Sequence, residues 1–140
     1  MNEPRGFRGY IASRPILGER TPQHVQNLVV RDYAKRRGMT YLLSATEWTM
    51  DECFMVLEEV LDDLPRLEGV IAYSLFMLPT DPARRARVWD RLLASDKSFH
   101  MALEGLVVAD TRSVARVEDI WLARSVLPRC PTAPPGLADR

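Results

Sequence analysis

The fold is decided by one stretch of the sequence, Gly9-Tyr10-Ile11-Ala12-Ser13-Arg14-Pro15-Ile16-Leu17-Gly18-Glu19-Arg20-Thr21-Pro22. Its first four residues form a short apolar run, which predicts a buried strand. Pro15 ends that strand, because proline keeps the residue before it out of helical dihedral angles. Thr21 and Pro22 are typical of a helix start, as a cap and a first-turn residue. A strand followed by a helix is one half of a βαβ unit.

The same order of a short apolar run and a longer amphipathic segment recurs along the chain. Further strands are predicted at residues 40–43, 70–73 and 99–103. Further helices are predicted from Thr49, from Asp81 and from about Ser113, and the last of them runs to about residue 126. Thr49 and Glu52 form a capping box for the second helix.

Helical spacing also predicts which side chains face the sheet. The first helix is expected to bury Val25, Leu28, Val29 and Tyr33, and the last helix to bury Leu122 among its apolar residues. Arg85 is expected at the rim of the third helix, and His100 in the fourth strand is expected to be a hydrogen-bonded core histidine.

These elements predict an α/β fold with three layers, a doubly wound sheet of four parallel strands in the order 2-1-3-4. The order follows from right-handed crossovers and from a first helix that returns on one face. In such a sheet the strand order reverses between strands one and three, and ligands bind beyond the carboxyl ends of the strands at that point. The residues that follow the strands are therefore the candidate site.

Composition bounds the function. The 140 residues suit one domain, predicted at residues 1–127 and followed by a proline-rich, disordered tail at 128–140. A formal net charge of zero gives no field that attracts nucleic acid or an anionic membrane. The two cysteines, Cys53 and Cys130, have no metal-ligand spacing. We expect a cytoplasmic protein without metal, cofactor, nucleic-acid partner or membrane span, and by default a homodimer.

The loop after the first strand supplies candidate binding groups. Arg14 and Arg20 stand beside a helix start whose free amides favour anions, so phosphate or carboxylate binding is predicted there. The alternative is that both arginines pair with nearby glutamates or with solvent. Gln23 and Asn27 lie four residues apart on one helix face, where amides suit a polyhydroxylated ligand, unless both are merely solvated.

The ends of the other strands supply candidates for acid–base chemistry. Ser44 and Ser74 are predicted to bind substrate hydroxyls, and Glu47 and Glu104 to form an acid–base pair. Ser13 is a candidate nucleophile for which no base is evident in the sequence. The apolar residues 75–79 are expected either to wall the site or to pack on a neighbouring loop or a partner subunit.

The order of elements resembles the catalytic domain of serine recombinases, which implies a flavodoxin- or resolvase-like fold. In that family a tyrosine–arginine–serine pattern ends strand one, whereas this chain has Tyr10-Ile11-Ala12-Ser13-Arg14. The family's arginines after strand three are replaced by Ser74-Leu75-Phe76-Met77-Leu78-Pro79. The resemblance therefore concerns the fold, and DNA strand exchange is not expected.

A second resemblance extends over nearly the whole domain. The chain resembles the sporadic carbohydrate cluster proteins in residues 8–15, 22–28, 41–47, 72–76, 104–105 and 120–122. The family's name reflects surface-polysaccharide and unusual-sugar pathways, so the resemblance implies a sugar-pathway role and no particular mechanism.

These observations predict a carbohydrate-biosynthesis enzyme that acts on a phosphorylated or nucleotide-linked sugar. Proton transfer by Glu47 and Glu104 would serve an epimerase, isomerase or dehydratase, and glycosidic-bond cleavage uses similar carboxylates. The alternative is a non-catalytic binding or scaffold subunit that docks on a partner enzyme through the apolar residues 75–78. In that case Phe76→Asp would abolish docking.

Overall fold

The computed structural model describes residues 5–16, 18–47 and 53–126. Five strands and four α-helices follow one another along these residues. They are β1 (Phe7–Ala12), α1 (Gln23–Arg36), β2 (Tyr41–Glu47), α2 (Met55–Asp62), β3 (Gly69–Ala72), α3 (Pro82–Ala94), β4 (Ser98–Met101), β5 (Leu106–Val108) and α4 (Thr111–Val126). Two short 3-10 helices, η1 (Leu64–Arg66) and η2 (Leu75–Met77), flank β3. The predicted tail at 128–140 lies outside the described residues.

The sheet has five strands in the order β2-β1-β3-β4-β5. The first four are parallel, and β5 pairs antiparallel with β4 at the edge. The α/β class is confirmed, whereas the prediction of four all-parallel strands is wrong in count and in the complete order. A three-residue run gives little periodicity, and strands of this length fall at the lower limit of those in globular proteins. For this reason β5 was not predicted from the sequence.

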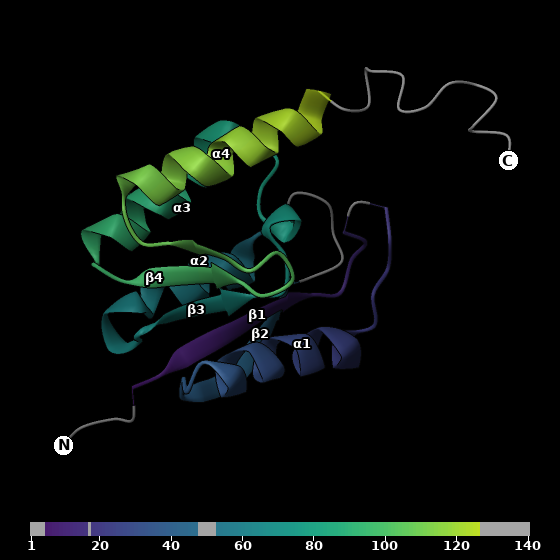
Figure 1. Cartoon of the computed structure of the whole chain (residues 1–140), viewed down its shortest axis with the longest axis vertical. Coiled ribbons are helices and arrows are strands. Elements are labelled where there is room, and N and C mark those ends of the chain that lie inside the picture. The colour runs from purple at the N-terminus through teal and green to yellow at the C-terminus, as the bar shows by residue number, and fades with distance from the viewer. Residues whose placement is uncertain (1–4, 17, 48–52, 127–140) are drawn as a thin grey trace, which may run out of the picture.

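The helices cover both faces of the sheet. Helix α1 lies on one face and α3 and α4 on the other, with the sheet between them (Figure 1). Strands β1 and β3 are central, and β3 is buried along its whole length because helices cover both of its faces. No helix in residues 5–16, 18–47 and 53–126 is long and apolar enough to cross a bilayer.

Helix α1 buries Tyr33 as predicted, but the rest of its buried stripe differs from the prediction. Its buried residues are Gln26, Val30, Tyr33 and Ala34, and Leu28 is 63% exposed. The rotation follows from Gln26, whose amide accepts from Ala12 N at 2.9 Å and donates to Ala12 O at 2.7 Å and Thr21 O at 2.9 Å. The Gln26 amide is thus buried at the end of β1 with three hydrogen bonds that satisfy it.

Helices α3 and α4 are joined by a partly buried ion pair. Asp81 caps α3 as predicted, and its carboxylate accepts from Ala83 N at 3.0 Å. Arg85 is not at the rim, because only 4% of it is exposed and its guanidinium donates to both carboxylate oxygens of Glu118 at 2.8 and 2.9 Å. Leu122 was predicted to face inward but is 64% exposed, and Val117 and Trp121 form the buried face of α4.

His100 confirms the expectation of a hydrogen-bonded core histidine. Its Nδ1 lies 2.8 Å from the Tyr33 hydroxyl and its Nε2 lies 3.0 Å from Ser98 Oγ. Burial, and then the nearby Arg37, lower the pKa of His100 from 6.5 to about 4. The imidazole is therefore neutral at neutral pH and belongs to the core.

Candidate functional site

A pocket of about 370 Å³ lies beyond the carboxyl ends of the parallel strands. We call it the strand-end pocket. Its lining comes from the loop after β1, the segment after β3, the turn after β4 and the last turn of α4. The lining residues are Ile16, Glu19, Thr21, Tyr73, Ser74, Phe76, Leu103, Glu104 and Arg124. Two of the candidates from the sequence, Ser74 and Glu104, are among them.

Ser74 and Glu104 form a hydrogen-bonded pair in this pocket. Ser74 Oγ donates to Glu104 Oε2 at 2.6 Å, and Leu75 N donates to Glu104 Oε1 at 3.0 Å. The turn after β4 is held beside β3, because Ala102 N donates to Ala72 O and Leu103 N to Tyr73 O, both at 2.9 Å. Each carboxylate oxygen has two lone pairs, so Glu104 can accept further bonds from a ligand.

Glu19 is the second carboxylate of the pocket. A pair of backbone hydrogen bonds holds it, from Ile16 N to Glu19 O at 2.8 Å and from Glu19 N to Ile16 O at 3.0 Å. Gly18 has a φ of +81°, which L side chains rarely adopt, and it allows the tight return between the two residues. Glu19 is one of the nearby glutamates that the sequence offered as alternative partners for Arg14 and Arg20.

Helix α4 completes the pocket with an aromatic contact and a cation. Phe76 packs edge to face on Trp121, with ring centroids 5.1 Å apart, and Arg85 lies 4.2 Å over the Trp121 ring. One turn beyond Trp121, Arg124 reaches the pocket lining. The Arg85–Glu118 ion pair and this aromatic contact therefore fix where Arg124 stands.

Glu47, predicted as the acid–base partner of Glu104, is not in the lining of this pocket. It is fully buried, and its carboxylate accepts from the Tyr10 hydroxyl at 2.5 Å, from Leu57 N at 2.9 Å and from Val56 N at 3.1 Å. Burial, and then the charge of Glu47, hold the pKa of Tyr10 well above its usual range. Glu47 thus caps α2 from β2, whereas the predicted capping box of Thr49 and Glu52 lies outside the described residues.

Ser13, Arg14 and Arg20 are bound to the backbone outside the pocket lining. Ser13 Oγ donates to Glu47 O at 2.8 Å. Arg14 is buried, donates to Cys53 O at 2.9 Å and Met77 O at 3.4 Å, and lies 4.5 Å over the Phe54 ring. Arg20 is exposed and reaches Ser13 O at 3.5 Å. Arg14 therefore links three loops by carbonyl contacts.

The remaining candidates lie near β2 or on the open face of α1. Asn27 Oδ1 accepts from the Tyr41 hydroxyl at 3.2 Å, and that hydroxyl also contacts Ser44 Oγ. Gln23 is exposed at the start of α1. None of the three is in the lining of the strand-end pocket.

The apolar segment after β3 is mostly buried. Leu75, Met77 and Leu78 are each at most 3% exposed, and Phe76 packs on Trp121. The segment thus packs on α4 through Phe76, and Phe76 also lines the strand-end pocket. Because Phe76→Asp would disturb this internal packing, the variant does not test docking on a partner by itself.

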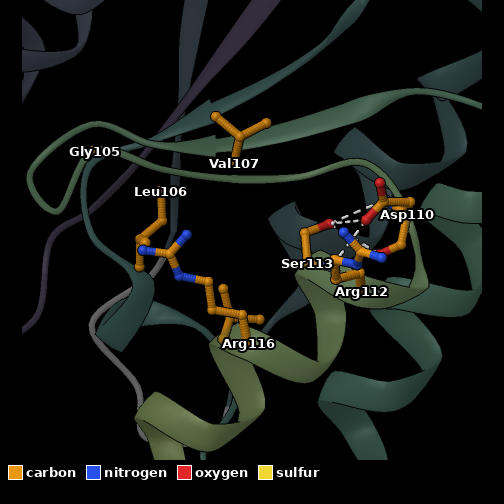
Figure 2. A pocket seen from close by; sticks show the side chains of 8 residues that line it. Gly105, Leu106, Val107, Asp110, Arg112, Ser113 and Arg116 are labelled. Carbon is orange, nitrogen blue, oxygen red and sulfur yellow. Dashed lines mark hydrogen bonds between the residues drawn. The ribbon is translucent and has the colours of Figure 1, made fainter.

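A second pocket of similar volume lies between β5 and the start of α4. Figure 2 shows Arg116 extending from α4 toward Leu106, while Asp110 and Ser113 face one another. Asp110 Oδ1 accepts from Ser113 N at 2.8 Å and from Ser113 Oγ at 2.9 Å. The start of α4 is thus already capped by a carboxylate, which opposes a second anion there.

Residues that hold a metal are not evident in the described part of the chain, where no three His, Cys, Asp or Glu side chains come together. Comparisons of the chain with protein-family models, with curated proteins and with solved structures give no match.

Proposed function

We propose that this protein is a carbohydrate-biosynthesis enzyme that moves a proton on a phosphorylated or nucleotide-linked sugar in the strand-end pocket. One observation carries the proposal. The Glu104 carboxylate lines a pocket together with the hydroxyl-bearing residues Thr21, Tyr73 and Ser74 and one guanidinium, Arg124. A proton acceptor, hydroxyl groups and a cation are the groups that such a sugar requires.

Glu104 is the proposed general base. Its two bonds from Ser74 Oγ and Leu75 N orient the carboxylate and leave lone pairs for a proton taken from carbon next to a carbonyl group. The electron pair of that C–H bond moves to the carbonyl oxygen, and Tyr73 is the proposed hydrogen-bond donor to that oxygen. Return of the proton to the neighbouring carbon, with the hydroxyl proton moving to the first oxygen, gives isomerisation, and return to the other face gives epimerisation. Delivery of the proton from Glu104 to a departing hydroxyl releases water and gives dehydration.

Arg124 is the proposed anchor for the phosphate. A guanidinium presents several N–H donors in a planar fork that matches phosphate oxygens. This assignment moves the anion-binding role from Arg14, whose guanidinium bonds to Cys53 O and Met77 O, to a residue of the pocket lining. The resemblance to sporadic carbohydrate cluster proteins is compatible with the same class of ligand.

The test is deuterium exchange in D₂O, followed by NMR, into sugar phosphates, whose open-chain form supplies the carbonyl group, and into nucleotide-linked keto sugars. General base catalysis contributes about 10²–10⁴-fold, so Glu104→Gln should reduce the exchange rate by a factor in that range. Gln retains an acceptor for Leu75 N, so the variant should keep its folding transition. Glu68→Gln, a charge-matched change in the exposed segment before β3, should leave exchange unaltered.

Two results would count against the proposal. Exchange that persists in folded Glu104→Gln would exclude this carboxylate as the base. Absence of both exchange and ligand-induced stabilisation across the panel would favour the binding or scaffold alternative.

A further inference from the structure

The strand-end pocket carries more negative than positive groups. Glu19 and Glu104 are carboxylates, and Arg124 is the one cation among the described residues that line it. The formal charges of these three groups sum to one net negative charge. A pocket walled by one sign of charge concentrates ligand groups of the opposite sign.

The pocket also has apolar surface. Ile16, Phe76 and Leu103 line it beside the two carboxylates, while Glu19 is exposed and can meet a ligand from solvent. Glu19 and Glu104 come from separate loops. The pair with Ile16 fixes the backbone of Glu19, and the bonds from Ser74 and Leu75 fix the carboxylate of Glu104. A ligand that brings a cation relieves the repulsion, whereas a second phosphate increases it.

The pocket volume sets the size of the ligand. Ligand pockets span about 300–1,000 Å³, and the 370 Å³ of this one lies near the lower end. A monosaccharide fits that volume better than a sugar joined to a nucleotide, and the diphosphate of the latter also brings a second negative group. The volume and the charge of the pocket therefore both argue against nucleotide-linked sugars as its ligands.

We propose that the ligand of the strand-end pocket is an amino sugar of monosaccharide size, with one anionic group bound by Arg124. Its ammonium group binds Glu19 and leaves Glu104 to accept a proton from carbon. This inference rests on the proposed function and narrows it from any phosphorylated sugar to an amino sugar monophosphate.

The experiment compares binding of three probes that differ only in the substituent at one position. The probes are glucosamine 6-phosphate, N-acetylglucosamine 6-phosphate and glucose 6-phosphate, with matched galactose and mannose sets, titrated into the full chain by calorimetry at pH 7. The amino probe of at least one set should bind about tenfold more tightly than its two partners, which corresponds to about 1.4 kcal/mol.

Substitutions test which pocket residues cause the preference for the amino probe. Glu19→Gln should abolish the tenfold preference for the amino probe, because the contact with its ammonium group is lost. The affinity for the N-acetylated probe should stay unchanged. Arg124→Gln should weaken all three probes of a set alike. Glu68→Gln, which changes the same charge before β3, should retain the preference.

The outcomes separate the two proposals. Equal affinities within every set, lost in Arg124→Gln, would overturn the amino-sugar inference and leave the proposed function standing. A preference that survives Glu19→Gln would overturn the assignment to that carboxylate. If no probe binds and nucleotide-linked sugars do, the inference fails while the function holds. If nothing binds, both fail.

Discussion

Glu47 and Glu104 stand at the carboxyl ends of β2 and β4, two strands of one sheet with β1 and β3 between them, and their surroundings differ. Glu47 is enclosed at the junction of β2 and α2, where a phenol and two amides donate to it. Glu104 stands in the turn after β4, accepts two bonds and lines a pocket. The fold supplies three hydrogen-bond donors to Glu47 and two to Glu104. The enclosed carboxylate stabilises the structure, whereas the one in the pocket can still accept hydrogen bonds from a ligand.

The largest expected difference between the two lies in stability. Glu47→Ala leaves the Tyr10 hydroxyl and the amides of Val56 and Leu57 without their acceptor in a closed space. Buried groups left unsatisfied cost about 1–3 kcal/mol each, so the free energy of unfolding should fall by about 3 kcal/mol or more. Urea unfolding monitored by circular dichroism measures the loss.

His100 is a second side chain whose hydrogen bonds are all made within the fold, and its effect on stability can be tested by changing the pH. The folded protein keeps its imidazole neutral down to a pKa of about 4, whereas the unfolded chain takes up the proton near pH 6.5. Because the unfolded state binds more protons in this window, stability should be lost as pH falls through it, by up to about 3 kcal/mol. His100→Gln should flatten the profile of unfolding free energy against pH, and His24→Gln, on the exposed part of α1, should not.

A smaller effect is expected at the open carboxylate. Glu104→Ala removes the acceptor of Ser74 Oγ and Leu75 N, but pocket water can replace it. The free energy of unfolding should fall by about 1 kcal/mol, less than for Glu47→Ala measured in the same urea series. Equal losses at the two positions would show that the pocket is no more accessible to water than the β2–α2 junction.

The smallest effect is expected at Gln23, which was predicted from the sequence to be a sugar-binding amide. Its side chain is exposed at the start of α1 and is outside the lining of the strand-end pocket. Gln23→Ala should change stability by less than about 0.5 kcal/mol and leave ligand affinity unaltered. A weakened ligand titration would extend the site toward α1.

Local patterns predicted the parallel strands and the region of the candidate site. Runs such as residues 9–12 and 70–73 are buried on both faces, and proline and aspartate mark the helix starts, so each signal is contained within a few residues. The position of the candidate site, beyond the carboxyl ends of the strands, follows from the order of the strands in the sheet. These parts of the fold are therefore accessible without a structure.

The roles of individual side chains depend on contacts between distant segments. Nothing near Glu47 in the sequence indicates that Tyr10 and the first turn of α2 will enclose it. Arg124 reaches the pocket because Arg85 and Glu118 join α3 to α4. The homodimer, the cytoplasmic location and the family resemblance stay predictions.

The hairpin that bears Glu104 has a consequence for how this scaffold can diversify. The turn of residues 102–105 joins β4 to an edge strand, and at Gly105, whose φ is +70°, no atom lies within 4 Å of the place that a Cβ would take. Edge turns accept changes in length and sequence that a central crossover does not. Changes to this turn that retain Glu104 and Gly105 can therefore alter the proposed substrate choice while the four parallel strands keep their packing.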